Sequence, residues 1–286
     1  MNFEFSEEQQ MLRDQARSYL TQHCPTTLVR RVLNNRESHD ADLYKGIAEM
    51  GWTATTIPEE YGGLGMSYLE LVVIAEELGR ACAPVPFSST VYLAAEAIMA
   101  LGTEAQKQAW LPKFADGTAI GCFAMGEAGG RVTPDQMSTR MQDGVLNGTK
   151  VPVADGGIAN VAIVVCASEK GDGATLALVD LSQDAVSKDN VQMIDFSRGH
   201  SELVFNGACA ETLGEEGAGW TAVESLMNTA AVLFAWEQIG IADKALEQAR
   251  EYALGRFAFG RSIASYQAIK HKLAKMYVKN TLARSN

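Results

Sequence analysis

The stretch GRFAFGRSIASYQAIKH (Gly255–His271) decides the fold assignment of this chain. It lies in a long pattern of helical periodicity, yet it carries features that a plain amphipathic helix does not need. Arg256, Phe259 and Gln267 offer a forked cation, an aromatic ring and an amide that both donates and accepts hydrogen bonds. A purely structural interpretation treats Arg256 as a solvated helix charge and Phe259 as an ordinary core residue. The density of unusual residues argues against it.

Composition limits the possible function classes. The chain has 286 residues and a formal net charge of -11. This length suits one large domain or two to three smaller ones. Because neutralising phosphates needs clustered Lys and Arg, the acidic balance argues against a nucleic-acid partner. No apolar run reaches the about 18 residues of a spanning helix. The amino terminus has neither a basic start nor an apolar segment, so we expect no membrane span and no secretory signal.

The cysteines and histidines do not predict a metal site. The 5 cysteines are odd in number and scattered without metal-ligand spacing, and the 4 histidines show no paired spacing. Reduced, mostly buried thiols are typical of a cytoplasmic protein. Lys150 and Lys270 fit solvated charges better than nucleophiles. We therefore expect no bound metal and a cytoplasmic location.

Helical signals dominate residues 1–118. Ser6 with Gln9 forms a capping-box pattern before a set of apolar residues, and Thr103 with Gln106 repeats it. Further apolar stripes at helical spacing lie between these two caps. An amino-terminal all-α bundle is the natural way to bury them.

The hydrophobic period changes in residues 119–213. Short apolar runs are separated by turn signals such as Asn147-Gly148 and Asp155-Gly156. The expected strands cover residues 120–125, 161–166, 175–179, 191–194 and 203–205. A small antiparallel β-sheet or barrel is the economical interpretation of this middle domain.

Helical periodicity returns in residues 214–286, with helices expected over 221–253 and 263–283. Helices, then strands, then helices, without alternation, predict an α+β fold with segregated layers. The expected domains are an amino-terminal helical domain (1–118), a middle β domain (119–213) and a carboxy-terminal helical domain (214–286). Two helices make only a partial α-bundle, so further residues or other chains are expected to cover their apolar faces.

This three-part order resembles the acyl-CoA dehydrogenase family over essentially the whole chain. The 255–271 stretch carries the resemblance, together with the loop PEEYGGLG (Pro58–Gly65) and the Glu-Glu-Leu-Gly helix after it. It implies FAD as cofactor, an acyl-CoA thioester as substrate and α,β-dehydrogenation as the reaction. It also implies an oligomer, expected to be a tetramer, and an electron-transferring flavoprotein as electron acceptor. In this family, residues matching Arg256, Phe259 and Gln267 reach from one subunit onto the FAD of its neighbour.

The flavin-binding strand departs from the family pattern. The segment GEAGGRVT (Gly126–Thr133) stands where members typically carry Thr-Glu-Pro-Gly-Ala-Gly-Ser-Asp. Gly126 replaces a threonine and Val132 replaces a serine, so neither side chain can donate a hydrogen bond to flavin or substrate. The resemblance still implies cofactor contacts at Phe123 and at the backbone of Met125 and Gly126. It implies a substrate contact at Val132.

A second departure lies in KVPVADGGIAN (Lys150–Asn160). The family usually holds an aromatic ring against the flavin and a threonine near its N5 atom in this segment. Pro152 and Ala154 occupy those two places. Ala154 is therefore an expected cofactor contact that has lost its hydroxyl.

The catalytic base is the third departure. Ala230 aligns with the glutamate that some members use as base, Ala231 with an arginine that contacts acyl-CoA, and Asn228 with a nearby aspartate. Asn228 and Ala231 are thus the expected substrate contacts. Glu237 lies seven residues after Ala230 on the same helical face, about 10 Å away from it at 1.5 Å per residue. It is the candidate base, although a glutamate paired at a subunit contact fits it better.

Three functional interpretations remain open. In the leading one, the chain is a subunit of an FAD-dependent acyl-CoA dehydrogenase. It keeps the groups that reach a neighbour's cofactor and has lost those used on its own, which is the pattern of a non-catalytic partner in a mixed oligomer. The second is a conventional homo-oligomeric dehydrogenase whose base lies beyond residue 286. The third is a flavin-free helical scaffold for assembly.

Overall fold

The computed structural model describes residues 5–130, 132–168 and 170–285. The α-helices are α1 (Glu7–His23), α2 (Thr26–Asn35), α3 (Ala41–Glu49), α4 (Tyr68–Ala81), α5 (Glu96–Leu101), α6 (Glu104–Ala115), α7 (Gly219–Gly255) and α8 (Gln267–Ser285). The strands are β1 (Gly121–Ala124), β2 (Arg140–Gln142), β3 (Val145–Ala154), β4 (Val161–Ala167), β5 (Ala174–Asp180), β6 (Val186–Val191), β7 (His200–Cys209), β8 (Glu211–Leu213), β9 (Phe257–Ala258) and β10 (Arg261–Ser262). A π-helix, η3 (Ser88–Ala95), precedes α5.

The chain packs as two compact units. Unit 1 comprises Met1–Thr26, Leu69–Ala83 and Val232–Asn286, and unit 2 comprises Thr27–Tyr68 and Pro84–Ala231. Unit 2 holds the main sheet, and unit 1 holds α1, α4, α8 and most of α7. The sequence-based domain boundaries, after residues 118 and 213, remain predictions about folding units.

The predicted α+β class is confirmed, with a helical amino-terminal region, a sheet in the middle and helices at the end. The sheet runs in the order β6-β7-β3-β2-β4-β5-β8, with β1 also pairing with β4. It is mixed and not wholly antiparallel, because β1 and β2 both run parallel to β4. In the described residues, the end strands β6 and β8 do not pair with each other, so the sheet stays open and does not form the alternative barrel.

Strand β4 is buried on both faces and separates two hydrophobic cores. Ile163 and Val165 point into the first core, whereas Val164 and Cys166 point into the second. This alternation follows from the two-residue period of a strand. The first core lies between the sheet and helices α5 and α6, and the second is closed by residues of β3 and β7. Burial on both sides explains why β4 is a continuous apolar run in the sequence.

Both predicted capping boxes are confirmed. The Ser6 hydroxyl accepts from the Gln9 amide at the start of α1, and the Gln9 side chain accepts from the Ser6 amide. Thr103 and Gln106 make the same reciprocal pair at the start of α6. Each box satisfies two backbone donors that a helix start leaves unpaired.

In unit 1, helices α4 and α7 meet backbone to backbone through two glycines. A Cβ atom on Gly240 would lie 1.9 Å from the carbonyl oxygen of Glu76, and one on Gly79 would lie 2.1 Å from that of Glu237. No side chain fits at such separations, so glycine permits this crossing by lacking a Cβ.

Charged side chains around the crossing hold α1, α4, α7 and α8 together. Arg284 donates to both carboxylate oxygens of Glu76, at 2.8 Å each, and also to Asp243. Arg13 of α1 donates to the same Glu76 at 3.1 Å. Glu76 is only 3 % exposed, so these charge-assisted bonds offset its removal from water.

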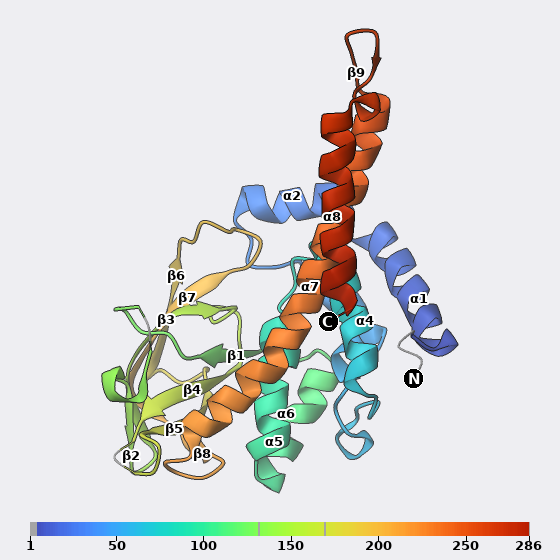
Figure 1. The fold of residues 1–286 in the computed structure, drawn as a ribbon. Helices are drawn as coiled ribbons and strands as arrows, with labels where there is room; N and C mark the ends of the chain where they lie inside the picture. Colours follow the sequence, from blue (N-terminus) through green and yellow to red (C-terminus); the bar gives the residue numbers. More distant parts are fainter. Residues whose placement is uncertain (1–4, 131, 169, 286) are drawn as a thin grey trace. The chain divides into compact units, whose positions relative to one another are not determined.

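The predicted final helix begins later than expected, because residues 256–266 do not continue a helical path. Helix α7 ends at Gly255, a hairpin of β9 and β10 follows, and α8 begins at Gln267. Figure 1 shows α7 and α8 running antiparallel with this hairpin at their shared end. The turn residues Phe259 and Gly260 have φ values of 52° and 77°, which is left-handed backbone that no helix tolerates.

We predict that Gly240→Ala lowers the free energy of unfolding by about 1–3 kcal/mol, the range for overpacking a tight contact. The reason is the 1.9 Å approach of its new Cβ to the Glu76 oxygen. Gly255→Ala is the matched control, since nothing lies within 4 Å of a Cβ at that end of the same helix. Denaturant unfolding of the two variants measures the difference. Equal free energies of unfolding for the two variants would contradict the prediction, because α4 and α7 would then accommodate the Cβ atom without loss of stability.

Candidate functional site

Most of the middle-domain residues predicted to contact flavin or substrate lie in β1 or in the segment after it. Phe123, Met125 and Val132 are partly buried and pack against the first core. The amide of Val151 donates to the carbonyl oxygen of Gly126 at 2.9 Å. A Cβ on Gly126 would lie 2.9 Å from the Val151 oxygen, so this close approach favours glycine.

We use the name sheet wall for the exit of β1 (Phe123–Gly126), Val132 and Thr133, together with the end of β3 (Lys150–Ala154). A buried ion pair anchors this wall. Lys150 on β3 has a side chain that is 0 % exposed, which makes its prediction as a solvated charge wrong. Its Nζ donates to Glu127 Oε1 at 2.8 Å and to the Met125 carbonyl at 3.1 Å. The other oxygen of Glu127, Oε2, accepts from the amide and the hydroxyl of Ser138, at 2.8 and 2.7 Å.

The electrostatics of the pair follow from burial and hydrogen bonding together. Burial disfavours the charged carboxylate of Glu127, but the hydrogen bonds from Lys150, Ser138 and Thr139 outweigh it and lower its pKa to about 2. Burial also lowers the pKa of Lys150, and the attraction of Glu127 partly offsets that effect. The carboxylate is therefore firmly ionised at neutral pH.

The end of β3 presents little chemistry. Val153 points into the second core, so by alternation Pro152 and Ala154 point to the opposite side. The pairing of β3 with β7 shifts register between Lys150 and Val153. Neither Pro152 nor Ala154 carries a hydroxyl or an aromatic ring, as the sequence indicated.

One polar atom near this wall lacks a partner. The hydroxyl oxygen of Thr133, the residue after Val132, is buried and makes no hydrogen bond among the described residues. Buried hydroxyls are nearly always bonded, so this one is available to a ligand. The wall can thus hydrogen-bond a flavin through backbone groups and the Thr133 hydroxyl. The side chains at positions 126, 132 and 154 offer no hydrogen bond.

The other predicted cofactor residues are exposed in and beside the β9–β10 hairpin, with Arg256 before β9 and Gln267 at the start of α8. Arg256, Phe259 and Gln267 are all exposed, and Phe259 is 97 % exposed. Phe259 occupies the first turn position with positive φ, which costs a bulky residue conformational energy. Tyr266 holds the hairpin in place, because its hydroxyl donates to the Ala258 carbonyl at 2.9 Å and its ring packs against the Arg261 guanidinium.

Helix α7 carries the remaining predicted residues. Asn228 and Ala231 are exposed in unit 2, and Ala230 is fully buried. Glu237 is 7 % exposed and its carbonyl faces Gly79 at the crossing in unit 1. Its role as a base stays a prediction, and its place in a helix contact favours the alternative structural role.

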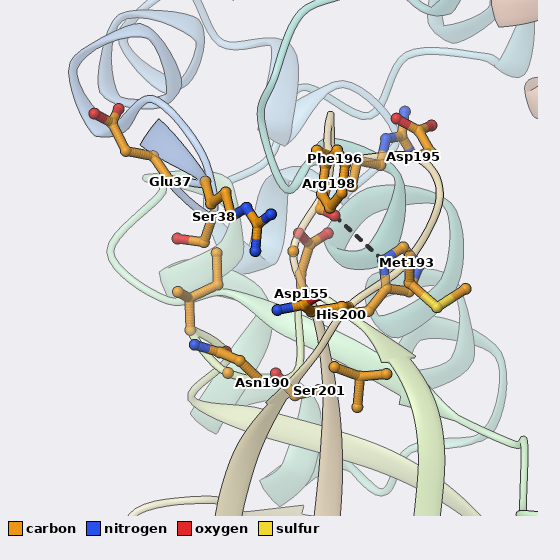
Figure 2. Close-up of a pocket in the computed structure, with 16 residues that line it drawn as sticks. Glu37, Ser38, Asp155, Asn190, Met193, Asp195, Phe196, Arg198, His200 and Ser201 are labelled. Atoms are coloured by element: carbon orange, nitrogen blue, oxygen red, sulfur yellow. Dashed lines mark hydrogen bonds between the residues drawn. The ribbon is translucent and has the colours of Figure 1, made fainter. Parts of the chain in front are cut away.

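Sequence reasoning missed a cleft of about 480 Å³ in unit 2. Figure 2 shows Asp155 and His200 among its lining residues, with His200 Nδ1 near the carbonyl oxygen of Arg198 at 3.2 Å. Asp155 accepts from the Ser89 hydroxyl of η3 at 2.5 Å. Burial raises the pKa of Asp155, although Ser89 and Arg198 favour its charged form. The sequence marked Asp155 only as a turn residue and gave no signal for His200, and none of the predicted site residues lines the cleft.

Metal and membrane features were also sought in the described part of the chain. There, no cluster of His, Cys, Asp or Glu is arranged to hold a metal ion. The helices of that part are each too short or too polar to cross a bilayer.

We predict that acid destabilises this protein partly through Glu127. Its pKa falls from 4.5 to about 2 on folding. The stabilisation is therefore complete above about pH 4.5 and is lost as the pH falls toward 2. Glu127→Gln should be less stable at neutral pH but lose less stability over this range than the wild type. Urea unfolding between pH 7 and pH 2.5 measures it, with the exposed Glu216→Gln as control. Parallel curves for wild type and Glu127→Gln would contradict the assignment.

Comparison with known proteins identifies the family. The acyl-CoA dehydrogenase N-terminal domain matches residues 6–118, and the acyl-CoA dehydrogenase C-terminal domain matches residues 217–286. Acryloyl-CoA reductase (NADH) of Anaerotignum propionicum is 30% identical over 100% of this chain and 76% of its own length.

Solved structures agree. Butyryl-CoA dehydrogenase from Megasphaera elsdenii superposes with a TM-score of 0.90 and 28% identity, covering 100% of this chain and 79% of that one. A steroid ACAD named Tcur3481-Tcur3483 superposes with a TM-score of 0.85 and 29% identity over 96% of this chain and 74% of that one. The resemblance seen in the sequence is confirmed: the chain belongs to the acyl-CoA dehydrogenase family, whose members are FAD flavoproteins and oxidoreductases.

Proposed function

We propose that this chain is a subunit of an FAD-dependent acyl-CoA dehydrogenase and that it completes the flavin site of a catalytic partner subunit. The reaction removes a proton from the carbon alpha to the thioester and a hydride from the beta carbon, leaving an enoyl thioester. When bound, FAD supplies the hydride acceptor. This chain contributes Phe259 of the hairpin, Arg256 just before it and Gln267 at the start of α8 to the partner's cofactor.

One observation carries the proposal, the contrast between the hairpin and the sheet wall. The hairpin is held in place by Tyr266, and with its flanking residues it exposes a cation for pyrophosphate, an aromatic ring and an amide. The wall offers no side-chain hydroxyl at Gly126, Val132 or Ala154. Flavin held on this chain's own wall therefore depends on backbone groups, on the Thr133 hydroxyl and on a hairpin from the partner.

One comparison supports a mixed oligomer. The similar steroid ACAD bears a name that joins two designations. We propose a tetramer with two chain types, an acyl-CoA thioester as substrate and an electron-transferring flavoprotein as acceptor. A bulky, sterol-derived acyl group is the substrate class that this parallel favours. A cytoplasmic location remains a prediction from the sequence.

Two other functions remain as alternatives. A conventional homo-oligomeric dehydrogenase would carry its base outside the residues described. A flavin-free assembly scaffold would use the hairpin only for packing. The visible spectrum of the purified chain separates these, because oxidised flavin absorbs where the apoprotein does not. We expect far less than one FAD per chain in isolation and restored flavin after co-expression with a catalytic paralogue. A yellow, active homo-oligomer with one FAD per chain would sink the mixed-oligomer proposal.

Arg256→Ala tests the hairpin directly. Loss of a charge-assisted, two-pronged contact should weaken FAD binding in the mixed oligomer by about tenfold or more. Arg250→Ala is the matched control, because Arg250 is an exposed arginine of α7 outside the hairpin. FAD release followed by fluorescence measures both variants. Unchanged flavin affinity in Arg256→Ala would show that the hairpin serves assembly alone.

Phe259→Asn separates stability from function. Asparagine tolerates positive φ, so the change should stabilise the isolated chain by about 1 kcal/mol. The same change removes the ring and should increase FAD loss from the mixed oligomer. Phe257→Asn, on the exposed strand next to the turn, is the control and should give no stabilisation. Thermal unfolding and FAD fluorescence report the two effects, and a destabilised Phe259→Asn would refute the strain argument.

A further inference from the structure

The side chain of Tyr266 contacts both strands of the β9–β10 hairpin from outside the hairpin. Its hydroxyl donates to the Ala258 carbonyl at 2.9 Å, and Ala258 is the residue directly before Phe259. Its ring lies against the guanidinium of Arg261, which pairs with Ala258 across the hairpin, with 4.0 Å between the ring centroid and Cζ. One side chain thus supports the hairpin immediately next to the exposed phenylalanine.

The base of the hairpin is anchored to α7 by other residues. The Ser262 hydroxyl lies within hydrogen-bond distance of the carbonyl oxygens of Ala253 and Leu254, at 2.7 and 3.0 Å. The Ile263 amide donates to the Arg256 carbonyl at 2.8 Å. Because these bonds already fix the base and the backbone of Arg256, the tyrosine hydroxyl acts on the tip of the hairpin alone.

The tip depends on such support because its backbone is strained. Phe259 has a φ of 52° and is 97 % exposed, so packing of its own ring does not hold this conformation. Strained backbone persists where surrounding contacts determine it. Among the described residues, the bond from Tyr266 to Ala258 is the only side-chain hydrogen bond to residues 257–261.

The same tyrosine also begins α8. The amides of Ile269 and Lys270 both donate to the Tyr266 carbonyl at 3.1 Å, and Gln267 is the next residue in the chain. Tyr266 therefore links the turn that carries Phe259 to the helix start that carries Gln267.

We propose that Tyr266 is a positioning residue for the partner's cofactor, whose hydroxyl fixes Phe259 relative to Gln267 before the two subunits meet. Ordering a loop during binding reduces affinity, and a loop that is ordered beforehand avoids that loss. The inference rests on the proposed function and adds to it the residue that presents the contacts.

The test is a double-mutant cycle in the co-purified mixed oligomer. Tyr266→Phe removes the hydroxyl and keeps the ring against Arg261, and Phe259→Ala removes the ring that the hydroxyl positions. The dissociation constant of FAD is measured by fluorescence for the wild type, both single variants and the double variant. Tyr277→Phe is the matched control, because that tyrosine of α8 is 64 % exposed and its hydroxyl makes no hydrogen bond within the described part of the chain.

We expect Tyr266→Phe to weaken FAD binding about two- to tenfold, the effect of one lost hydrogen bond. In the Phe259→Ala background the same change should have little further effect, because no ring remains to be positioned. A structural role alone would instead weaken binding by the same factor in both backgrounds. Tyr277→Phe should leave the dissociation constant unchanged.

The outcomes separate this inference from the proposed function. Weaker binding in Phe259→Ala together with unchanged binding in Tyr266→Phe would overturn the role of Tyr266 and leave the hairpin's role intact. Equal losses from Tyr266→Phe in the two backgrounds would also overturn it. Unchanged binding in Phe259→Ala would refute the proposed contact with the partner's cofactor, and the role of Tyr266 with it.

Discussion

The burial of β4 on both faces is the constraint from which the architecture of unit 2 follows. A strand whose odd and even residues are all apolar must be covered on two sides. Helices α5 and α6 cover one side, and the sheet supplies the other cover from β3 and β7. This arrangement places β1 beside β4 and brings the exit of β1 to the middle of β3, where the candidate flavin wall lies.

Within that wall, the Lys150–Glu127 ion pair orients backbone groups, which apolar packing cannot do. Lys150 and Glu127 sit among buried residues, where replacement by apolar side chains of similar volume is often neutral for stability. A pair of ions is directional, however, and these two fix the Met125 carbonyl and the backbone of Ser138 and Thr139 at once. Their value lies in holding backbone groups in a defined orientation, which suits a site that relies on backbone donors.

Unit 1 is organised on different principles. Its helices approach through Gly79 and Gly240, and charges around Glu76 hold the approach together. The hairpin between α7 and α8 is exposed and not packed, and it holds Phe259 in a strained backbone conformation. Strain of this kind persists where surrounding contacts determine the conformation, and it is concentrated at functional sites. Helices α7 and α8 thus present an exposed hairpin with a strained turn, which is suited to binding a partner's cofactor.

The sequence by itself determined the class, the order of the layers, the two capping boxes and the family. These depend on local rules, namely period, helix-start chemistry and a dense motif, which act within a few residues. It also located the departures at Gly126, Val132 and Ala154, because a missing hydroxyl is visible without a structure. The strand β3 escaped detection, since Asn147, Gly148 and Pro152 interrupt its apolar pattern.

Tertiary structure alone decided the rest. The expected strand at residues 191–194 ends at Val191, and Ile194 is 100 % exposed, because no strand in the described part of the chain pairs with residues 192–194. Lys150 became a buried ion, and Asp155 became the partner of Ser89, through residues more than 20 positions away in the chain. The sequence predicted a break between the last two helices at residues 254–262, but not the hairpin that fills it, whose turn has left-handed φ values at Phe259 and Gly260. Long-range partners and backbone handedness are fixed by packing, and a single sequence does not display either.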